Sequence, residues 1–171
     1  MPVIFSSTSG EATFRADERL YTLDEAAMLD AIATEQPALL YLSHPNNPTG
    51  TMITEKDRAR LIRELERRKI FLISDDVYAE LAFRDAYQPL SSISPFAITV
   101  SSWSKSLALT GWRIGFAAAN REIIAAMTKI HQYTMMCAPT MAQVAAIEAL
   151  KSGEESVEEM VADYNRRRQV I

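Results

Sequence analysis

The fold is decided by residues 38–74, which read ALLYLSHPNNPTGTMITEKDRARLIRELERRKIFLIS. Two short runs in this stretch, at 38–43 and 70–74, are largely apolar and have the length of buried strands. Thr54 lies between them with Asp57 three residues on, which is a helix-start signal, and apolar residues follow at helical spacing. A strand, a helix and a second apolar strand in this order indicate an α/β fold with parallel strands.

The alternation of strands and helices continues on both sides of this unit. Further strands are predicted at 3–7, 97–101 and 113–119. Further helices are predicted from a capping box at 22–25 to about residue 34, over about 121–133 and 140–151, and from 155 onward. Because apolar strands that alternate with helices need cover on both faces, we expect a three-layer α/β/α sandwich with a mainly parallel sheet.

The composition is ordinary for a globular domain and narrows the function. The chain has 171 residues, of which 48% are hydrophobic and 23% charged, and its net charge is −4. This charge provides no excess positive field, which argues against nucleic acid as a partner. The single cysteine, Cys137, excludes an internal disulfide and is expected to be a buried small hydrophobe. His131 has no partner at ligand spacing, so no metal site is expected.

Neither a membrane span nor a secretion signal is expected. No apolar run approaches the roughly 20 residues that cross a bilayer. Residues 1–5 lack the basic flank and long apolar core of a signal peptide, so a cytoplasmic location is the default expectation. The chain enters a β-prone run almost at once and stops inside a helical pattern, so both ends look cut.

Three polar segments follow predicted strands, at residues 44–50, 75–78 and 102–105. Ligands of open parallel sheets bind outside the carboxyl ends of the strands, which selects these three places. In the first segment an asparagine side chain could donate to a ligand oxygen, because Pro48 and Gly50 fix a tight turn. A plain strand-to-helix turn explains that segment equally well.

The second segment places two carboxylates, Asp75 and Asp76, directly after an apolar strand. They cannot both face the core cheaply, so one is expected to point into the site and the other to solvent or a helix cap. Tyr78 could offer its hydroxyl to the same ligand. Taken alone, a helix N-cap with a core tyrosine is the better interpretation of this segment.

The third segment holds Lys105 between serines, and Arg113 follows eight residues later between two glycines. A lysine that forms a Schiff base must be held out of bulk water so that its amine is often neutral. A phosphorylated cofactor beside it needs hydroxyl and guanidinium donors at close range. This segment offers all of these groups.

Together the three segments resemble the pyridoxal 5′-phosphate (PLP) enzymes of the aspartate aminotransferase superfamily, fold type I, which include the class I and II aminotransferases. The matching motifs, in the family's order, are Asn47-Pro48-Thr49-Gly50, Asp75-x-x-Tyr78, Ser102-x-Ser104-Lys105 and Gly111-x-Arg113-x-Gly115. The resemblance covers essentially the whole chain. It implies PLP as cofactor, an amino acid and a 2-oxo acid as substrates, and a homodimer for the full-length enzyme.

The resemblance implies three catalytic residues, Lys105, Asp75 and Tyr78. Lys105 would form the internal aldimine and then move a proton between the substrate α-carbon and the cofactor. Asp75 would keep the pyridine nitrogen protonated, so that the ring can act as an electron sink. Tyr78 would hydrogen-bond the ring 3′-oxygen.

The resemblance also implies residues that bind the cofactor without reacting. Asn47 would share the ring 3′-oxygen with Tyr78. Arg113 would clamp the phosphate, together with the hydroxyls of Ser102 and Ser104. Asp76 sits beside the family's key position and is interpreted as structural.

By the same resemblance, residues 1–151 would form part of a PLP-binding large domain, and residues 152–171 would begin the helix that leads to a small domain. The strands near Ile70, Ala38, Ala97 and Arg113 would lie side by side, the last one antiparallel, and the strand at 3–7 would lack its usual neighbour. Exposed edges and apolar patches should follow, so the chain alone is expected to self-associate or to be completed by a second chain.

Two alternatives to amino-group transfer remain open. One is a C–S β-lyase on the same scaffold, although such enzymes often carry a histidine where this chain has Tyr78. The other is a truncated, catalytically inactive fragment, because the family's carboxylate-binding arginine and glycine-rich phosphate turn are not found in these residues.

Overall fold

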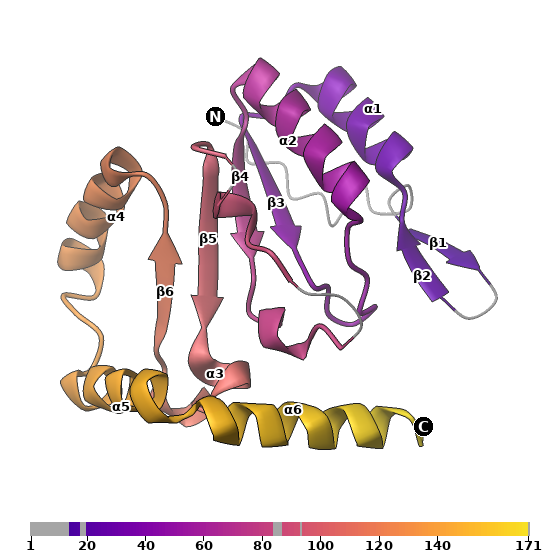
Figure 1. The fold of residues 1–171 in the computed structure, drawn as a ribbon. Helices are drawn as coiled ribbons and strands as arrows, with labels where there is room; N and C mark the ends of the chain where they lie inside the picture. Colours follow the sequence, from indigo (N-terminus) through magenta and orange to yellow (C-terminus); the bar gives the residue numbers. More distant parts are fainter. Residues whose placement is uncertain (1–13, 18–19, 84–86, 93, 171) are drawn as a thin grey trace.

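The computed structural model describes residues 14–17, 20–83, 87–92 and 94–170 (Figure 1). The strands are β1 (Phe14–Asp17), β2 (Leu20–Leu23), β3 (Leu39–Ser43), β4 (Phe71–Asp75), β5 (Ala97–Ser102) and β6 (Gly115–Ala118). The helices are α1 (Glu25–Glu35), α2 (Glu55–Arg68), α3 (Trp103–Ser106), α4 (Arg121–Thr134), α5 (Thr140–Ser152) and α6 (Glu154–Arg168). Short 3-10 helices are η2 (Ala79–Leu81), η3 (Leu90–Ser92) and η4 (Thr110–Trp112).

The main sheet is mainly parallel and is packed against helices, which confirms the predicted α/β class in an incomplete form. Its strand order is β3-β4-β5-β6. The first three strands run parallel to one another, and β6 pairs antiparallel with β5, as expected for the last strand. The strand that starts near Ile70 lies between the strands near Ala38 and Ala97, so β3 forms one edge of the described sheet.

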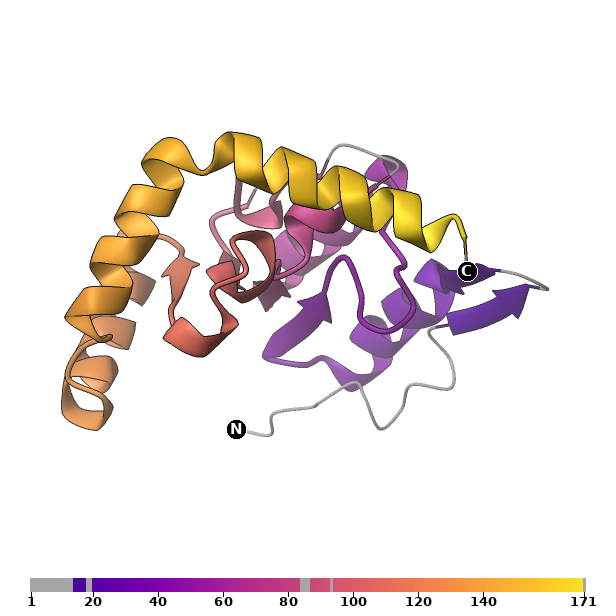
Figure 2. The same cartoon turned by 90° about the horizontal axis from the view of Figure 1, so that it is seen from below.

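Helices α1 and α2 pack side by side on one face of this sheet (Figures 1 and 2). Thr54 caps α2 as predicted, because its side chain accepts a hydrogen bond from the Asp57 N–H at 3.2 Å. The inner face of α2 is fully buried: Leu61 is 0% exposed and Leu65 is 1% exposed. Burying one such side chain is worth roughly 1.5–3 kcal/mol, so this cluster anchors the βαβ unit.

The opposite face of the sheet is much more open. Tyr41, Phe71 and Val100 are 41%, 38% and 36% exposed, whereas Leu40 and Leu72 on the α2 side are buried. The prediction of buried strands at 38–43 and 70–74 therefore holds for one face of the sheet and is wrong for the other within the described residues. Burial alternates because side chains of a strand alternate between two faces, and only one face is covered by α1 and α2.

Several boundaries differ from the prediction for local reasons. Strands β1 and β2 pair antiparallel, so Thr22 lies in a strand and Asp24 caps α1 instead. Arg113 has a left-handed backbone (φ 54°) and therefore precedes β6 rather than starting it. The strand predicted at 3–7 lies outside the described residues.

The last three helices, α4, α5 and α6, follow β6 in the chain. Ala142 and Ala146 of α5 pack with Ile114 in a small second core, against which Trp103 also lies. Helix α6 runs along the end of the sheet where β3, β4 and β5 finish (Figures 1 and 2). Its Arg168 guanidinium lies 5.1 Å from the centre of the Phe83 ring.

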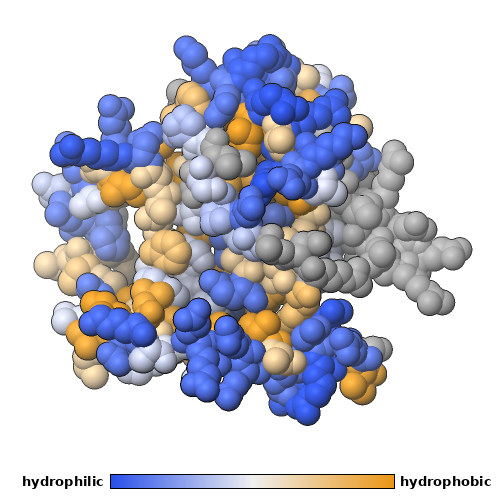
Figure 3. Space-filling model, in the orientation of Figure 1, coloured by the Kyte–Doolittle hydropathy of each residue, from blue (hydrophilic) through white to orange (hydrophobic). Residues whose placement is uncertain are grey.

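Helix α5 shows apolar side chains on its outer face. Its exposed apolar residues are Met141, Val144, Ile147 and Leu150. Figure 3 shows hydrophobic surface, in orange, in the region of α5. Even so, none of the helices in the described ranges combines the length and apolarity needed to cross a bilayer.

Candidate active site

The three predicted polar segments meet at one edge of the sheet. In the parallel register Ser43 pairs with Asp75, and Asp75 pairs with Val100, so β3, β4 and β5 finish almost level. Their continuations are the turn after β3, the segment leading to η2, and α3. The sequence prediction that these segments lie together is thus consistent with the observed register.

Asn47 lies in a turn that its neighbour Asn46 holds closed. The Asn46 N–H donates to the Thr51 carbonyl at 3.1 Å, and the Gly50 N–H donates to the Asn46 carbonyl at 2.8 Å. The side chain of Asn47 is exposed, and its Nδ2 donates to the Tyr78 hydroxyl at 3.0 Å. The structure therefore brings two of the predicted cofactor residues into direct contact.

Lys105 lies in the short helix α3, next to Tyr78. Its Nζ is 5.9 Å from the centre of the Tyr78 ring. The Thr110 hydroxyl donates to the Ser104 carbonyl at 2.7 Å, which ties α3 to the following turn. Lys105 is exposed, so the described residues do not show the exclusion of bulk water that a Schiff-base lysine requires.

Asp75 is half-buried at the end of β4, and its carboxylate is held from two sides. Oδ2 accepts a hydrogen bond from the Tyr41 hydroxyl at 2.5 Å, and Oδ1 accepts a longer one, 3.4 Å, from the Val77 N–H. Burial, reinforced by the bond to Asp75, raises the pKa of Tyr41 to about 12. Sequence reasoning missed Tyr41, because a tyrosine within an apolar strand gives no signal of its contact with the neighbouring strand.

Arg113 and Ser102 lie on neighbouring segments of the same edge. Ser102 ends β5 and pairs with Gly115 of β6, two residues after Arg113. The exposed Arg113 guanidinium donates from Nη1 to the Thr110 carbonyl at 3.0 Å. Within the described part of the chain, this bond goes to the turn rather than to the Ser102 or Ser104 hydroxyl.

Asp76 points away from this edge, into the protein. It is 3% exposed, and its Oδ1 accepts a hydrogen bond from the Ser74 hydroxyl at 2.5 Å. Burial raises its pKa, although the hydrogen bond from Ser74 lowers it. The expectation that the second carboxylate faces solvent or a cap is therefore wrong, while its structural interpretation fits this placement.

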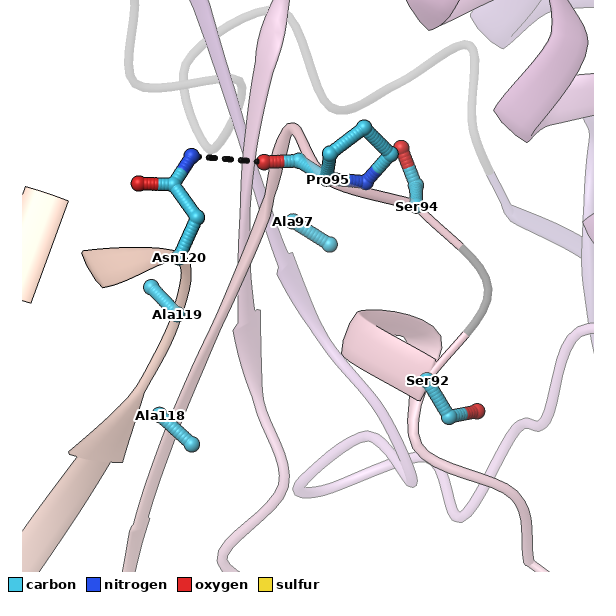
Figure 4. Close-up of a pocket in the computed structure, with 7 residues that line it drawn as sticks. All are labelled: Ser92, Ser94, Pro95, Ala97, Ala118, Ala119 and Asn120. Atoms are coloured by element: carbon cyan, nitrogen blue, oxygen red, sulfur yellow. Dashed lines mark hydrogen bonds between the residues drawn. The ribbon is translucent and has the colours of Figure 1, made fainter. Parts of the chain in front are cut away.

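A hollow elsewhere on the molecule does not belong to this site. Its lining residues are Ser92, Ser94, Pro95, Ala97, Ala118, Ala119 and Asn120 (Figure 4). The Asn120 side chain donates to the Pro95 carbonyl there at 3.1 Å. Since Ala97 begins β5 and Ser102 ends it, the hollow lies at the opposite end of the sheet from Lys105.

Comparison with known proteins identifies the family. Residues 3–171 match the family described as aminotransferase class I and II. The chain belongs to this family. It is 35% identical over 160 residues to an aspartate aminotransferase of Pyrococcus horikoshii, an alignment that covers 91% of this chain and 40% of the relative.

Two further proteins, one named a transaminase and one an aminotransferase, agree with this assignment. The chain is 35% identical over 173 residues to an asparagine–oxo-acid transaminase of Streptococcus mutans, which covers 98% of the chain and 42% of the relative. The solved N-succinyldiaminopimelate aminotransferase from Mycobacterium tuberculosis superposes with a TM-score of 0.84 at 28% identity, over 91% of this chain and 41% of that one. The chain thus spans about 40% of the length of these relatives.

Class I and II aminotransferases depend on PLP, and the residues of this edge fit that cofactor. A primary amine (Lys105) lies beside a tyrosine that an asparagine side chain already contacts, and a carboxylate (Asp75) ends the adjacent strand. In the described part of the chain no carboxylate lies within ion-pair distance of the Lys105 amine or the Arg113 guanidinium.

Proposed function

We propose that this chain carries the PLP-attachment half of an enzyme that transfers an amino group between an amino acid and a 2-oxo acid. The observation that carries the proposal is the placement of the Lys105 amine over the Tyr78 ring, with Tyr78 bonded in turn to Asn47. An amine, a phenol and an amide from three separate segments converge at the carboxyl edge of the sheet, where ligands of such sheets bind.

Each residue then has a task that follows from its chemistry. Lys105 would be the covalent attachment point for the cofactor and, when released, a base whose Nζ takes and returns the substrate proton. Asp75 would hold a proton on the cofactor's ring nitrogen, because its carboxylate is an acceptor fixed at the end of β4. PLP supplies an electron sink for the pair released from the substrate's Cα–H bond.

The remaining residues would orient the cofactor. The Asn47 amide and the Tyr78 hydroxyl, 3.0 Å apart, can both donate to one oxygen on the ring. Arg113 would bind the phosphate, with the hydroxyls of Ser102 and Ser104 as further donors, because a guanidinium offers paired donors to phosphate oxygens. For this, the guanidinium must exchange its present bond to the Thr110 carbonyl for the phosphate.

The assembly and organisation of the enzyme are part of the proposal. We propose that residues 1–151 belong to the PLP-binding large domain and that 152–171 begin the helix toward a second domain. The exposed apolar side chains of α5 support a homodimer in the full-length protein. A biosynthetic role and a cytoplasmic location complete the proposal, the latter supported by the lone Cys137, which leaves no internal disulfide.

The alternatives differ in the reaction that the PLP-loaded protein would catalyse. A C–S β-lyase on this scaffold would bind PLP at Lys105 and release sulfide from a cysteine-type substrate. An inactive fragment would bind PLP without converting any pair of amino acid and 2-oxo acid. Tyr78 and the amino-group transfer stated in the names of both relatives favour transamination.

Attachment of PLP to Lys105 can be tested directly. Purified protein is mixed with PLP, the lysine–PLP link is made permanent with borohydride, and the labelled peptide is mapped by mass spectrometry. The label should fall on Lys105 and disappear in Lys105→Ala. The matched control is Lys129→Ala, which removes an exposed amine from α4 and should leave the label in place. A label on other lysines alone would overturn the assignment.

A further inference from the structure

The Tyr41 hydroxyl makes a contact that the family motifs of this chain do not explain. Its donor lies in β3 and its acceptor, Oδ2 of Asp75, in β4, at 2.5 Å. Tyr41 pairs with Ile73 in the parallel register, two residues before Asp75. Side chains two residues apart on neighbouring strands share one face, so the long phenol reaches along the sheet to the carboxylate at its edge.

The backbone of Asp75 is fixed independently of Tyr41. Its carbonyl accepts from the His44 N–H at 3.0 Å, and the next N–H, of Asp76, donates to the Val100 carbonyl at 2.9 Å. What remains free is the rotation of the carboxylate itself. The bond from the Val77 N–H to Oδ1 is long, at 3.4 Å, so the Tyr41 bond is the stronger constraint on that rotation.

We propose that Tyr41 is a positioning residue for Asp75: its hydroxyl fixes the carboxylate in the orientation that binds the ring nitrogen of PLP. This inference rests on the proposed function. A carboxylate oxygen can accept more than one hydrogen bond, so the bond from Tyr41 leaves Asp75 able to accept from a ligand. A neutral donor also spreads the negative charge without cancelling it, so Asp75 stays an acceptor.

The protonation state of Tyr41 suits this role. Burial and the neighbouring Asp75 raise the pKa of the phenol to about 12, so the hydroxyl keeps its proton near neutral pH. Loss of that proton would set two negative oxygens against each other and break the arrangement. Tyr41 therefore acts as a permanent donor and not as an acid or base in the reaction.

The first test measures the equilibrium Kd of PLP in four proteins: wild type, Tyr41→Phe, Asp75→Asn and the double variant. Phenylalanine keeps the ring and removes only the donor. We expect Tyr41→Phe to weaken PLP binding about 10-fold in the wild-type background, because a hydrogen bond to a charged group is lost. In the Asp75→Asn background the same change should cost less than about 2-fold, because the two residues act as one unit.

A second measurement needs no cofactor. Tyrosine labelled with ¹³C at Cζ reports the ionisation of Tyr41 by NMR, with Tyr41→Phe assigning the signal. Asp75→Asn should lower the pKa of Tyr41 from about 12, since the carboxylate that favours the neutral phenol is gone. An unchanged Tyr41 pKa would show that the contact is absent in solution, and this arm decides the question even where Asp75→Asn binds PLP too weakly to measure.

The control is Tyr133→Phe, which removes the same hydroxyl from a side chain on α4 that is 92% exposed, and should not change the Kd. Two outcomes would overturn the role of Tyr41 even if the PLP label maps to Lys105. In one, Tyr41→Phe binds PLP as tightly as wild type; in the other, the substitution weakens PLP binding equally in both backgrounds. Wild-type protein that takes no label at Lys105 would instead refute the proposed function, and the positioning role with it.

Discussion

His44 is a buried histidine whose ring makes one hydrogen bond within the described residues, and this bond requires the neutral ring. It is 5% exposed, and its Nε2 accepts from the Ile53 N–H at 2.7 Å. Protonation would turn Nε2 into a donor facing another donor, in a buried place. Burial, with the nearby Arg58 cation as the second cause, accordingly lowers the pKa of His44 to about 4.

This pKa predicts an acid-sensitive fold. His44 takes up a proton near pH 4 in the folded chain and near pH 6.5 in the unfolded chain. The contribution of neutral His44 to the unfolding free energy is therefore complete above pH 6.5 and is lost as the pH falls toward 4. Between pH 7 and pH 5 the expected loss is about 2 kcal/mol of unfolding free energy, measured by urea denaturation. His44→Gln, whose amide oxygen can accept from Ile53, should flatten this dependence.

The other histidine of the chain provides the control. His131→Gln removes an imidazole from the exposed face of α4 and should leave the slope between pH 7 and pH 5 as in wild type. Two results would contradict the assignment of this pH dependence to His44: a His44→Gln variant that retains the full slope of unfolding free energy against pH, or a His131→Gln variant that abolishes the slope.

The sequence predicted which residues lie close together at the candidate site better than it predicted the contacts that hold them in place. Lys105, Tyr78 and Asn47 could be brought together from sequence because each belongs to a motif just after a strand, and parallel strands end at one edge. Tyr41 could not be found this way. Its partner lies 34 residues away in the chain, and their contact depends on strand register and on a side-chain rotamer that no local pattern specifies.

At the scale of elements, the pairing of β5 with β6 places Arg113 beside the end of β5, and one glycine makes that pairing possible. Gly115 lies opposite Ser102. A Cβ built on Gly115 would lie 2.7 Å from the Ser101 carbonyl oxygen and 3.1 Å from the Ser102 Cβ. The first of these neighbours is backbone, so it cannot move aside without disturbing the ladder.

Gly115→Ala is therefore expected to destabilise the chain, by about 1–3 kcal/mol, as overpacked sites do. Gly111→Ala is a matched control from the same motif, because a Cβ there meets nothing within 4 Å. It should change the unfolding free energy by less than about 0.5 kcal/mol. Urea denaturation of the three proteins measures both effects, and equal costs for the two alanines would show that the steric argument fails.

Local signals predicted elements well where no neighbour interfered. Thr54 and Asp57 start α2 as expected, because a cap is a contact within four residues. The predicted start of α1 is wrong because β2 pairs with β1 and includes Thr22 as a strand residue, which leaves Asp24 as the cap of α1. Cys137 was expected to be buried and is exposed, since the segment between α4 and α5 is not covered within the described residues.

On the scale of the whole molecule, the described residues show much exposed apolar surface. On one face of the sheet Tyr41, Phe71 and Val100 are each more than a third exposed. On α5, Ile147 and Leu150 are 51% and 63% exposed, although the helix also buries two alanines on its inner side. A helix that is apolar on nearly all sides is typical of the interior of a larger assembly.

We therefore expect the isolated chain to self-associate through this apolar surface. Sedimentation velocity should give species heavier than the 19.1 kDa monomer that dissociate on dilution. The double variant Ile147→Glu/Leu150→Glu should shift this distribution toward monomer without lowering the unfolding temperature, because both side chains are already more than half exposed. The control is Lys151→Glu, which makes the same change in net charge on α5 but removes no apolar side chain. Comparing the two variants shows whether dissociation comes from charge repulsion or from the loss of apolar contact. Two results would contradict association through the apolar face of α5. One is a wild-type chain that sediments as a monomer at all concentrations, and the other is a Lys151→Glu variant that dissociates as fully as the double variant.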